Sequence, residues 1–301
     1  MKIKILHNPY SNRWNSQKRW HEAESALRAA DVDFDLSVSQ RADHLVELAA
    51  KAVEQGFTTL IVAGGDGSIG EVINGAAQSW NATKPFPITL GILPLGTAND
   101  LGDNIGIPRD LSEVAQMIAK GKTRQIDLAK CNERYFLNNS AAGLEPYVST
   151  KQEKIKWISG VPRYLVAAVL GIWDQPNWNV KMEWDDGVYE GPLSLISVGN
   201  GQRTGGIFFM TPHANAFDGK LTFVYGYRST RLKLFQALPA AMKPGKGNMV
   251  EMDGIHEINC TWLKFKLDKP SPAHTDGELF DTWISNFEYK LFPATVPILV
   301  P

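Results

Sequence analysis

The stretch Leu60-Ile61-Val62-Ala63-Gly64-Gly65-Asp66-Gly67-Ser68-Ile69-Gly70-Glu71 places a short apolar run directly before a glycine-rich turn that carries one acid. A helical pattern continues over residues 71–77. Glycines in such a turn allow positive φ angles and a close approach of the backbone to a ligand. The start of the following helix offers N–H groups and the positive end of its dipole to an anion. The stretch therefore predicts a strand, a turn and a helix that handle phosphate groups.

The residues around this stretch alternate between strand and helix patterns as far as about residue 127. Strand patterns cover 3–6, 34–38, 58–63 and 88–93, and helix patterns cover 17–30, 42–54 and 111–119. Strands interleaved with helices favour right-handed β-α-β units and a mainly parallel sheet. We therefore expect a three-layer α/β domain over residues 1–127.

The second part of the chain is dominated by strand patterns. They cover 125–130, 135–138, 178–184, 193–198, 221–227, 256–267 and 282–291. Turn residues such as Asp185-Asp186-Gly187 separate them, and one helical stretch at about 149–172 interrupts the series. We expect an antiparallel β-sandwich with a helical insert over residues 128–290, while the tail, 291–301, could pack back onto the first domain.

The composition limits the class of protein. The chain has 301 residues, a formal net charge of −1 and only two cysteines, Cys131 and Cys260, which lie far apart in the sequence. Such a charge gives no reason to expect a nucleic-acid partner, and the cysteines suit a reducing compartment without a zinc site. The longest apolar run, from Tyr164 to Trp173, is too short to span a bilayer as a helix. A cytoplasmic, soluble protein is expected.

The Gly64–Ser68 turn has two interpretations. It lies at the carboxyl end of a predicted strand, where open α/β sheets bind their ligands. Alternatively, Ser68 and Glu71 form a capping box at the start of the next helix. The capping box explains these two residues but not the three glycines that surround an acid.

A second polar segment, 93–101, follows the strand predicted at 88–93 and should lie at the same edge of the sheet. Thr97 and Asn99 can hydrogen-bond a nucleotide, and Asp100 can organise water around a divalent cation. The alternative is that Thr97 or Asn99 caps a helix.

The third polar segment is Thr275-Asp276-Gly277-Glu278. If Gly277 keeps the turn tight, the two carboxylates can approach a common point, where one of them becomes a candidate general base. An ordinary Asp-Gly hairpin turn is the alternative.

Taken together, the three segments resemble the diacylglycerol kinase catalytic family, which includes bacterial lipid kinases and the sphingosine and ceramide kinases. Further matches follow in order at Asn8-Pro9-Tyr10-Ser11, Ile126-Asp127-Leu128, Asn200-Gly201, Gly205-Gly206, Pro212 and Asp218-Gly219-Lys220-Leu221. The resemblance covers nearly the whole chain, and the ordered set of motifs is far more specific than any one of them.

This resemblance implies a first domain similar to those of NAD kinase and phosphofructokinase and a lipid-binding β-sandwich. It also implies an ATP- and Mg²⁺-dependent lipid kinase of phospholipid metabolism. The enzyme would transfer the γ-phosphate of ATP to the hydroxyl group of diacylglycerol and form phosphatidic acid.

Each site residue receives a role from the resemblance. Asp276 would be the base on the acceptor hydroxyl, and Glu278 would orient it or help to hold magnesium. Asp66, the third catalytic acid, and Asp100 would reach magnesium through water. Asp218 would hold a separate structural magnesium ion, with an Asp-Gly hairpin as the alternative. The nucleotide site would consist of Gly64, Gly65, Asp66, Gly67, Ser68, Thr97 and Asn99, with Asn8 and Ser39 as further members.

Several functional alternatives stay open. The acceptor could be a sphingoid, ceramide or phosphatidylglycerol-like lipid, and the protein could be an NAD kinase or a non-catalytic nucleotide- or lipid-binding protein. Residues 151–165 mix cations with Trp and aliphatic side chains, as in segments that contact a membrane surface. Their alternative is a helix packed on the sandwich with a solvated basic face. A peripheral membrane contact without a membrane-spanning segment is expected, and a homodimer is left open.

Overall fold

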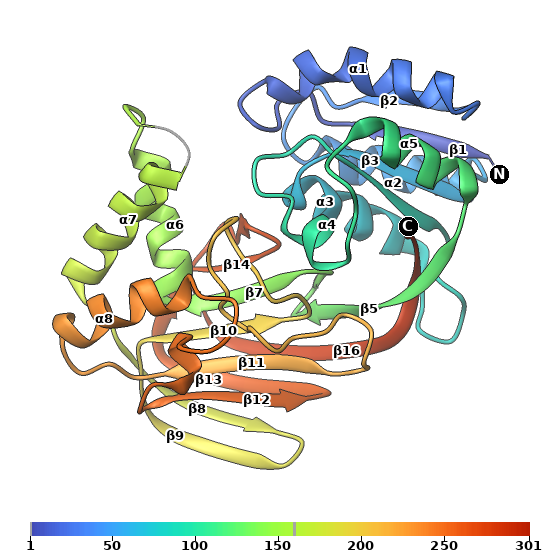
Figure 1. Cartoon of the computed structure of the whole chain (residues 1–301). Helices are drawn as coiled ribbons and strands as arrows, with labels where there is room; N and C mark the ends of the chain where they lie inside the picture. The colour runs from blue at the N-terminus through green and yellow to red at the C-terminus, as the bar shows by residue number, and fades with distance from the viewer. Residues whose placement is uncertain (1, 159–160) are drawn as a thin grey trace. The chain divides into compact units, whose positions relative to one another are not determined.

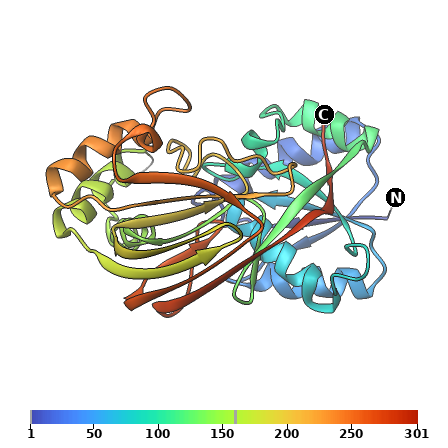
Figure 2. The ribbon, with the colours of Figure 1, turned by 90° about the horizontal axis from the view of Figure 1, so that it is seen from below.

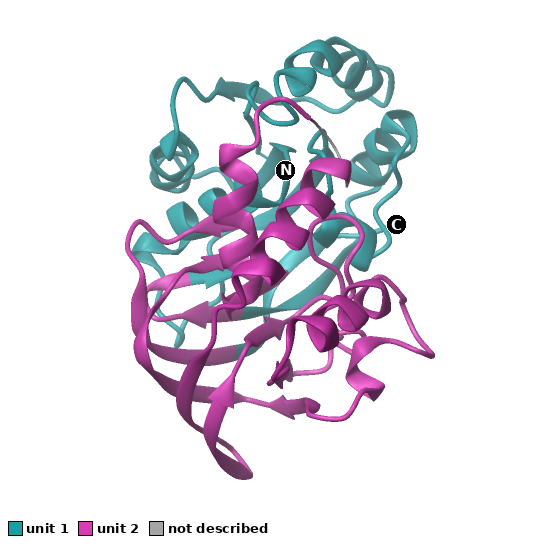
Figure 3. Ribbon diagram, turned by 90° about the vertical axis from the view of Figure 1, so that its left-hand side faces the viewer, with its two compact units in different colours: residues 1–128, 135–137, 292–301 teal, residues 129–134, 138–291 magenta. Residues whose placement is uncertain are grey.

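The computed structural model describes residues 2–158 and 161–301 of the chain (Figure 1). These residues form two compact units (Figure 3). Unit 1 comprises the chain up to Leu128 together with 135–137 and 292–301, and unit 2 comprises 129–134 and 138–291. Strands β5 (Thr123–Cys131), β6 (Arg134–Phe136) and β16 (Ile284–Leu299) each contribute residues to both units.

Unit 1 is built on a parallel sheet with the strand order β2-β1-β3-β4. The strands are β1 (Ile3–His7), β2 (Asp35–Val38), β3 (Thr59–Gly64) and β4 (Thr89–Pro94). All three pairings along this order are parallel, and the end of β16 adds to β4 in parallel through Ile298 and Leu90. The predicted parallel sheet is confirmed.

Helices cover both faces of this sheet (Figure 2). They are α1 (Asn15–Ala29) and α5 (Leu111–Lys120) on one face, and α2 (His44–Glu54) and α3 (Asp66–Ala76) on the other. Leu27 of α1 and Val114 of α5 are fully buried against Ile5 and Ile61 of the sheet. The predicted three-layer α/β architecture is therefore confirmed. Two short helical segments, the 3-10 helix η1 (Ala77–Ser79) and α4 (Asp100–Asn104), complete the unit.

Unit 2 contains two antiparallel sheets that pack face to face. One has the order β12-β11-β10-β7-β14-β15, and the other contains β9, β8, β13 and the first part of β16. The first sheet consists of β7 (Asn139–Gly143), β10 (Leu195–Gly199), β11 (Leu221–Gly226), β12 (Ile255–Cys260), β14 (Ala273–Thr275) and β15 (Glu278–Leu279). The second adds β8 (Trp178–Trp184), β9 (Gly187–Leu193) and β13 (Trp262–Ser271).

Aromatic side chains join the two sheets of unit 2. The ring of Trp184 on β8 lies 5.3 Å from that of Phe223 on β11. The hydroxyl of the fully buried Tyr289 on β16 lies 3.0 Å from Ser140 Oγ on β7. The predicted antiparallel β-sandwich is thereby confirmed.

Three helices and a 3-10 turn pack on the sheet that contains β10. They are α6 (Leu144–Lys154), α7 (Val161–Asp174), α8 (Arg231–Ala241) and η2 (Met249–Glu251). The single helix expected over 149–172 is wrong, because α6 ends at Lys154 and α7 begins at Val161. Pro162 lacks an N–H group and so belongs in the first turn of a helix rather than in its interior. Residues 159–160 of the basic and aromatic stretch lie outside the described residues.

Two further boundaries differ from expectation. The strand predicted over 256–267 is split into β12 and β13 at Thr261, whose N–H donates to the Asp185 carboxylate in the turn between β8 and β9. No helix was predicted over the residues of α8, which contains Pro239 in its interior. Within 2–158 and 161–301, no helix is both long and apolar enough to cross a membrane.

Candidate active site

The Asp66 carboxylate ties together the two polar loops of unit 1. Its Oδ2 accepts a hydrogen bond from the N–H of Asp100 at 3.0 Å, and its Oδ1 accepts one from the N–H of Leu101 at 2.9 Å. These are the first N–H groups of α4, which have no carbonyl partner within their own helix. Asp66 therefore caps α4 from the neighbouring strand-to-helix connection and fixes the loops after β3 and β4 to each other.

The glycines of these two loops are required because the loops approach each other closely, and not because the backbone has a positive φ angle there. Gly65, the N-cap of α3, has φ −113°, so the expected left-handed conformation is wrong for this residue. A Cβ atom on Gly96 would lie 2.4 Å from the Cα of Gly65 and 2.6 Å from Asn99 Oδ1. A Cβ on Gly64 would lie 2.6 Å from Ser68 Oγ. The two backbones thus meet at a distance that no larger residue permits.

Asn99 holds the loop after β4 in shape. It is the N-cap residue of α4 with φ 51°, but its side chain makes no capping bond. Its Oδ1 instead accepts from the N–H of Gly96 at 2.9 Å, and its Nδ2 donates to the Gly96 carbonyl at 3.1 Å. Thr97 is exposed and donates to Asn12 Oδ1 at 3.1 Å, so the side-chain capping alternative is wrong for both residues.

Ser68 and Glu71 do not form a capping box. Ser68 lies inside the first turn of α3, where its Oγ accepts from Asn8 Nδ2 at 2.9 Å and lies 3.3 Å from Ser11 Oγ. Glu71 Oε2 accepts from the N–H of Leu45 and so caps α2 instead. The opening turn at Asn8 therefore lies directly against the glycine-rich turn, as a shared site requires.

The ends of β1 and β2 complete this edge of the sheet. Ser39 follows β2, donates its N–H to the His7 carbonyl at 2.8 Å and its hydroxyl to the Arg41 carbonyl at 3.0 Å. Burial lowers the pKa of His7 to about 4, although its contact with Ser16 opposes the shift. The imidazole next to Asn8 is therefore neutral at pH 7, and it stacks on Trp20 at 4.7 Å.

Asp276 occupies a tight hairpin in unit 2. Strands β14 and β15 pair through Thr275 and Glu278, which leaves a two-residue loop with φ 47° at Asp276 and 85° at Gly277. Two successive positive φ angles are typical of an Asp-Gly hairpin turn, so that alternative is confirmed as a description of the backbone. The hairpin alternative does not explain why the Asp276 carboxylate is buried, since the side chains of turn residues are usually exposed.

The Asp276 carboxylate points inward and binds backbone amides. Asp276 is only 4% exposed, and its Oδ1 accepts from the N–H groups of Asn138 at 2.9 Å and Asn139 at 3.0 Å. The N–H of Asp276 itself donates to the Asn139 carbonyl at 2.7 Å. Glu278, in contrast, is exposed. The two acids thus have different surroundings, and only Asp276 is fixed by these amides.

Asp218 lies in an irregular segment before β11. It is exposed, its Oδ1 accepts from the N–H of Lys220 at 3.0 Å, and its own N–H donates to the Asn215 carbonyl. The Asp218-Gly219 pair does not connect two paired strands, so the hairpin alternative is wrong here. In the part of the chain that the structure describes, no group of three or more His, Cys, Asp or Glu side chains could hold a metal ion.

An apolar pocket in unit 2 was not predicted. It has a volume of about 70 Å³ and is bordered by α6, α7 and α8 together with Leu195 of β10 and Phe208. Glu145 is the one charged residue among the described residues that line it. The sequence signal was weak, because the lining residues come from segments more than a hundred positions apart.

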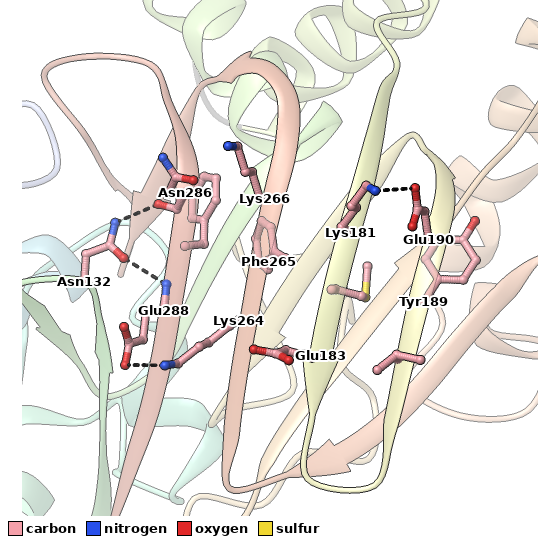
Figure 4. A pocket seen from close by; sticks show the side chains of 13 residues that line it. Asn132, Lys181, Glu183, Tyr189, Glu190, Lys264, Phe265, Lys266, Asn286 and Glu288 are labelled. Atoms are coloured by element: carbon pink, nitrogen blue, oxygen red, sulfur yellow. Dashed lines mark hydrogen bonds and ion pairs between the residues drawn. The ribbon is translucent and has the colours of Figure 1, made fainter.

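A larger groove of about 580 Å³ lies on strands β8, β9, β13 and β16 (Figure 4). Four of its charged side chains form cross-strand ion pairs, Lys181 with Glu190 at 2.8 Å and Lys264 with Glu288 at 3.3 Å. None of the predicted site residues lines it. Its lining has as many lysines as glutamates, so it carries no excess of one charge that would favour a phosphate.

Comparison with known proteins identifies the class of protein to which this chain belongs. The family described as diacylglycerol kinase catalytic domain matches residues 2–131, and the YegS C-terminal NAD kinase beta sandwich-like domain matches residues 139–300. The chain is 30% identical over 287 residues to a diacylglycerol kinase of Staphylococcus saprophyticus, covering 95% of this chain and 92% of that protein. It is 25% identical to a diacylglycerol kinase of Staphylococcus carnosus, covering 95% and 91%.

Solved structures share the fold. A crystal structure of a diacylglycerol kinase from Bacillus anthracis str. Sterne, 21% identical, superposes with a TM-score of 0.74 over 100% of this chain and 97% of that chain. A second crystal structure from the same organism is 24% identical and superposes with a TM-score of 0.80 over the same shares. These structures show the fold, and the sequence matches identify the class of protein as a lipid kinase. The chain belongs to the diacylglycerol kinase catalytic family, and the resemblance noted in its motifs is confirmed.

Proposed function

We propose that this lipid kinase transfers the γ-phosphate of ATP to the hydroxyl group of diacylglycerol, with magnesium as the cofactor and phosphatidic acid as the product. The observation that carries this proposal is the pair of hydrogen bonds that the first N–H groups of α4 donate to the Asp66 carboxylate. It fixes two loops at the carboxyl edge of a parallel sheet, next to the N-terminus of α3. Backbone N–H groups at such an edge bind the phosphates of a nucleotide.

The acids of unit 1 suit a magnesium ion held through water. Asp66 Oδ2 accepts a hydrogen bond from the backbone N–H of Asp100, so the Asp66 carboxylate lies next to the Asp100 backbone. A carboxylate oxygen that accepts one N–H retains acceptor capacity for a water molecule, and magnesium keeps several waters when a protein binds it. Bound magnesium would offset negative charge on the phosphates of ATP.

The acceptor lipid would use the apolar pocket of unit 2. The buried side chains of Val148, Ala168 and Ile172 line this pocket and suit part of an acyl chain. Its small volume, about 70 Å³, fits only a section of the lipid, so most of the acyl chain would remain in the membrane.

Asp276 would supply the base. Its ionised carboxylate would take the proton of the acceptor hydroxyl while the hydroxyl oxygen attacks the γ-phosphorus. The bond from that phosphorus to the β–γ bridging oxygen would break, and ADP would leave. In-line positioning is the main requirement of such a transfer. The two amide bonds to Oδ1 support this role, because they hold the carboxylate in one orientation.

A direct assay tests the proposal. The protein is incubated with γ-labelled ATP, magnesium and detergent micelles that contain diacylglycerol. We expect labelled phosphatidic acid in the organic phase, and chelation of magnesium should remove the signal. Parallel reactions with sphingosine, ceramide, phosphatidylglycerol and NAD compare the other acceptors. Label in NADP, or in none of the lipids, would contradict the proposed reaction.

We further propose that the helices of unit 2 touch the membrane surface. Trp157 is 78% exposed and follows α6, and Trp173 is 63% exposed near the end of α7. Arg231 lies over the Trp173 ring at 5.3 Å, and Lys154 and Lys156 are exposed beside Trp157. Tryptophan with nearby cations favours the headgroup region of an anionic bilayer.

The double variant Trp157→Ser/Trp173→Ser should bind vesicles of phosphatidylglycerol with a few per cent diacylglycerol at least about tenfold more weakly than the wild type. Loss of two aromatic side chains from the interface easily exceeds the ~1.4 kcal/mol that a tenfold change represents. Co-sedimentation measures the effect. Val188→Ser is the matched control, because Val188 is 79% exposed on β9 of the same unit. Equal weakening by both variants would argue against a specific membrane face.

A further inference from the structure

Three residues lie in one row across the sheet of unit 2. Ala141 on β7 is directly opposite Ser197 on β10 and directly opposite His274 on β14. Residues directly opposite in antiparallel strands direct their side chains to the same face. Because Ala141 is small, the face between Ser197 and His274 has room for a side chain from another element.

Glu145 fills this room and binds both neighbours. It lies in the first turn of α6, just after Gly143, whose φ of 87° turns the chain from β7 into the helix. Its Oε1 lies 3.1 Å from His274 Nε2, and its Oε2 accepts a hydrogen bond from the Ser197 hydroxyl. One carboxylate therefore fastens α6 to β10 and β14.

The network is buried. Glu145 is 7% exposed, His274 3% and Ser197 1%. A buried carboxylate is costly unless it is hydrogen-bonded, and here both Glu145 oxygens have a partner, so removal of one partner would leave a buried acid with an unsatisfied oxygen. The Nδ1 atom of His274 is buried without a hydrogen-bond partner among the described residues. Among the described residues, the imidazole contacts Glu145 through Nε2, and an ionised Glu145 carboxylate would require the proton to be on that nitrogen.

Strand β14, which contains His274, ends directly before Asp276, the proposed base. His274 precedes Asp276 by two positions, and the His274 carbonyl accepts from Ser140 Oγ at 2.7 Å. Asp276 is in turn fixed by the backbone of Asn138 and Asn139. These contacts come from Asn138 and from Asn139 and Ser140 at the start of β7, whereas the His274 imidazole provides the link to α6. Glu145, at the other end of that link, lines the apolar pocket.

We infer that His274 is a positioning residue, which through Glu145 fixes the Asp276 hairpin relative to the pocket for the acceptor lipid. This inference rests on the proposed function. Misplacement of a reacting group by about 1 Å can lower the rate of transfer by about 10²-fold, and the contacts that bind the substrate need not change. His274 therefore affects kcat for lipid phosphorylation and leaves the KM for ATP unchanged.

Steady-state kinetics and hydrogen exchange together test the inference. His274→Ala should lower kcat at least tenfold and change either KM by less than threefold, while His274→Gln, whose amide can still donate to Glu145, should recover most of the rate. In His274→Ala, peptides that cover 138–143 and 273–279 should exchange their amide hydrogens faster, and in His274→Gln they should return toward the wild-type rate. His213→Ala is the matched control, because His213 forms an exposed contact to Glu257 at 2.6 Å in the same unit.

The outcomes separate this inference from the proposed function. Unchanged exchange in both peptides, or equal loss of kcat in the Ala and Gln variants, would overturn the positioning role. A kcat of His274→Ala within twofold of the wild type would do the same. If the wild-type protein phosphorylates no lipid, the proposed function fails, and with it the role in transfer. The exchange measurement would then still report whether the His274 side chain holds the hairpin.

Discussion

Asp276→Asn is expected to lower kcat for lipid phosphorylation by a factor of about 10²–10⁴, the range typical of a general base. The substitution keeps an oxygen that can accept from the N–H groups of Asn138 and Asn139, so the hairpin should persist. It removes the group that takes the proton. The free energy of unfolding should therefore change little while the reaction is lost, and transfer of label from ATP to diacylglycerol measures the effect.

The chain offers a matched control for this variant. Asp186 lies before Gly187 in the turn between β8 and β9 of the same unit and is exposed. Asp186→Asn should leave the rate within about twofold of the wild type, because surface substitutions of this kind have small effects. Retention of activity in Asp276→Asn would show that another group accepts the proton. Loss of both activity and folding would indicate instead that the charge of Asp276 is structural.

Gly96→Ala should destabilise unit 1 by about 1–3 kcal/mol, the usual cost of forcing extra atoms into a packed site. The added Cβ would lie 2.4 Å from Gly65 Cα and 2.6 Å from Asn99 Oδ1. Of these atoms, Gly65 Cα is backbone and cannot rotate away. Separation of the two loops should also raise the KM for ATP. Urea unfolding gives the stability, and initial rates at varied ATP concentration give the KM.

Gly245→Ala is the comparison for this variant. A Cβ at Gly245 would meet nothing within 4 Å, and the residue is exposed. Its free energy of unfolding should change by no more than about 0.5 kcal/mol. If the two alanine variants had equal stability and equal KM for ATP, the close approach of the two loops would have no importance for nucleotide binding.

The elements of unit 1 and most strands of unit 2 could be predicted because their patterns are local. The strand over 178–184 was predicted with the bounds that the structure has, since its alternating side chains face core and solvent in turn. The helical insert of unit 2 was predicted only as one helix over 149–172, and α8 was not predicted. Helices α7 and α8 bury apolar residues against a sheet whose strands lie elsewhere in the sequence, and α8 contains a proline that argues against a helix.

At the candidate site, the capping alternatives show where local patterns mislead. Ser68 and Glu71 have the spacing of a capping box, yet Ser68 binds Asn8 and Glu71 binds the N–H of Leu45. Both partners are distant in the sequence. A carboxylate or hydroxyl binds whichever N–H the fold brings within reach, and sequence spacing reveals only the nearby candidates.

The sequence by itself determined the family, the two kinds of sheet and the polar loops that follow β3 and β4, because motif residues and periodicity are properties of short segments. Only the tertiary structure decided how those residues are used. It set the glycine contact between Gly65 and Gly96, the capping of α4 by Asp66, and the contact of Glu145 with His274. Each of these is a contact between segments that are far apart in the chain, so its partners become known only when the chain has folded.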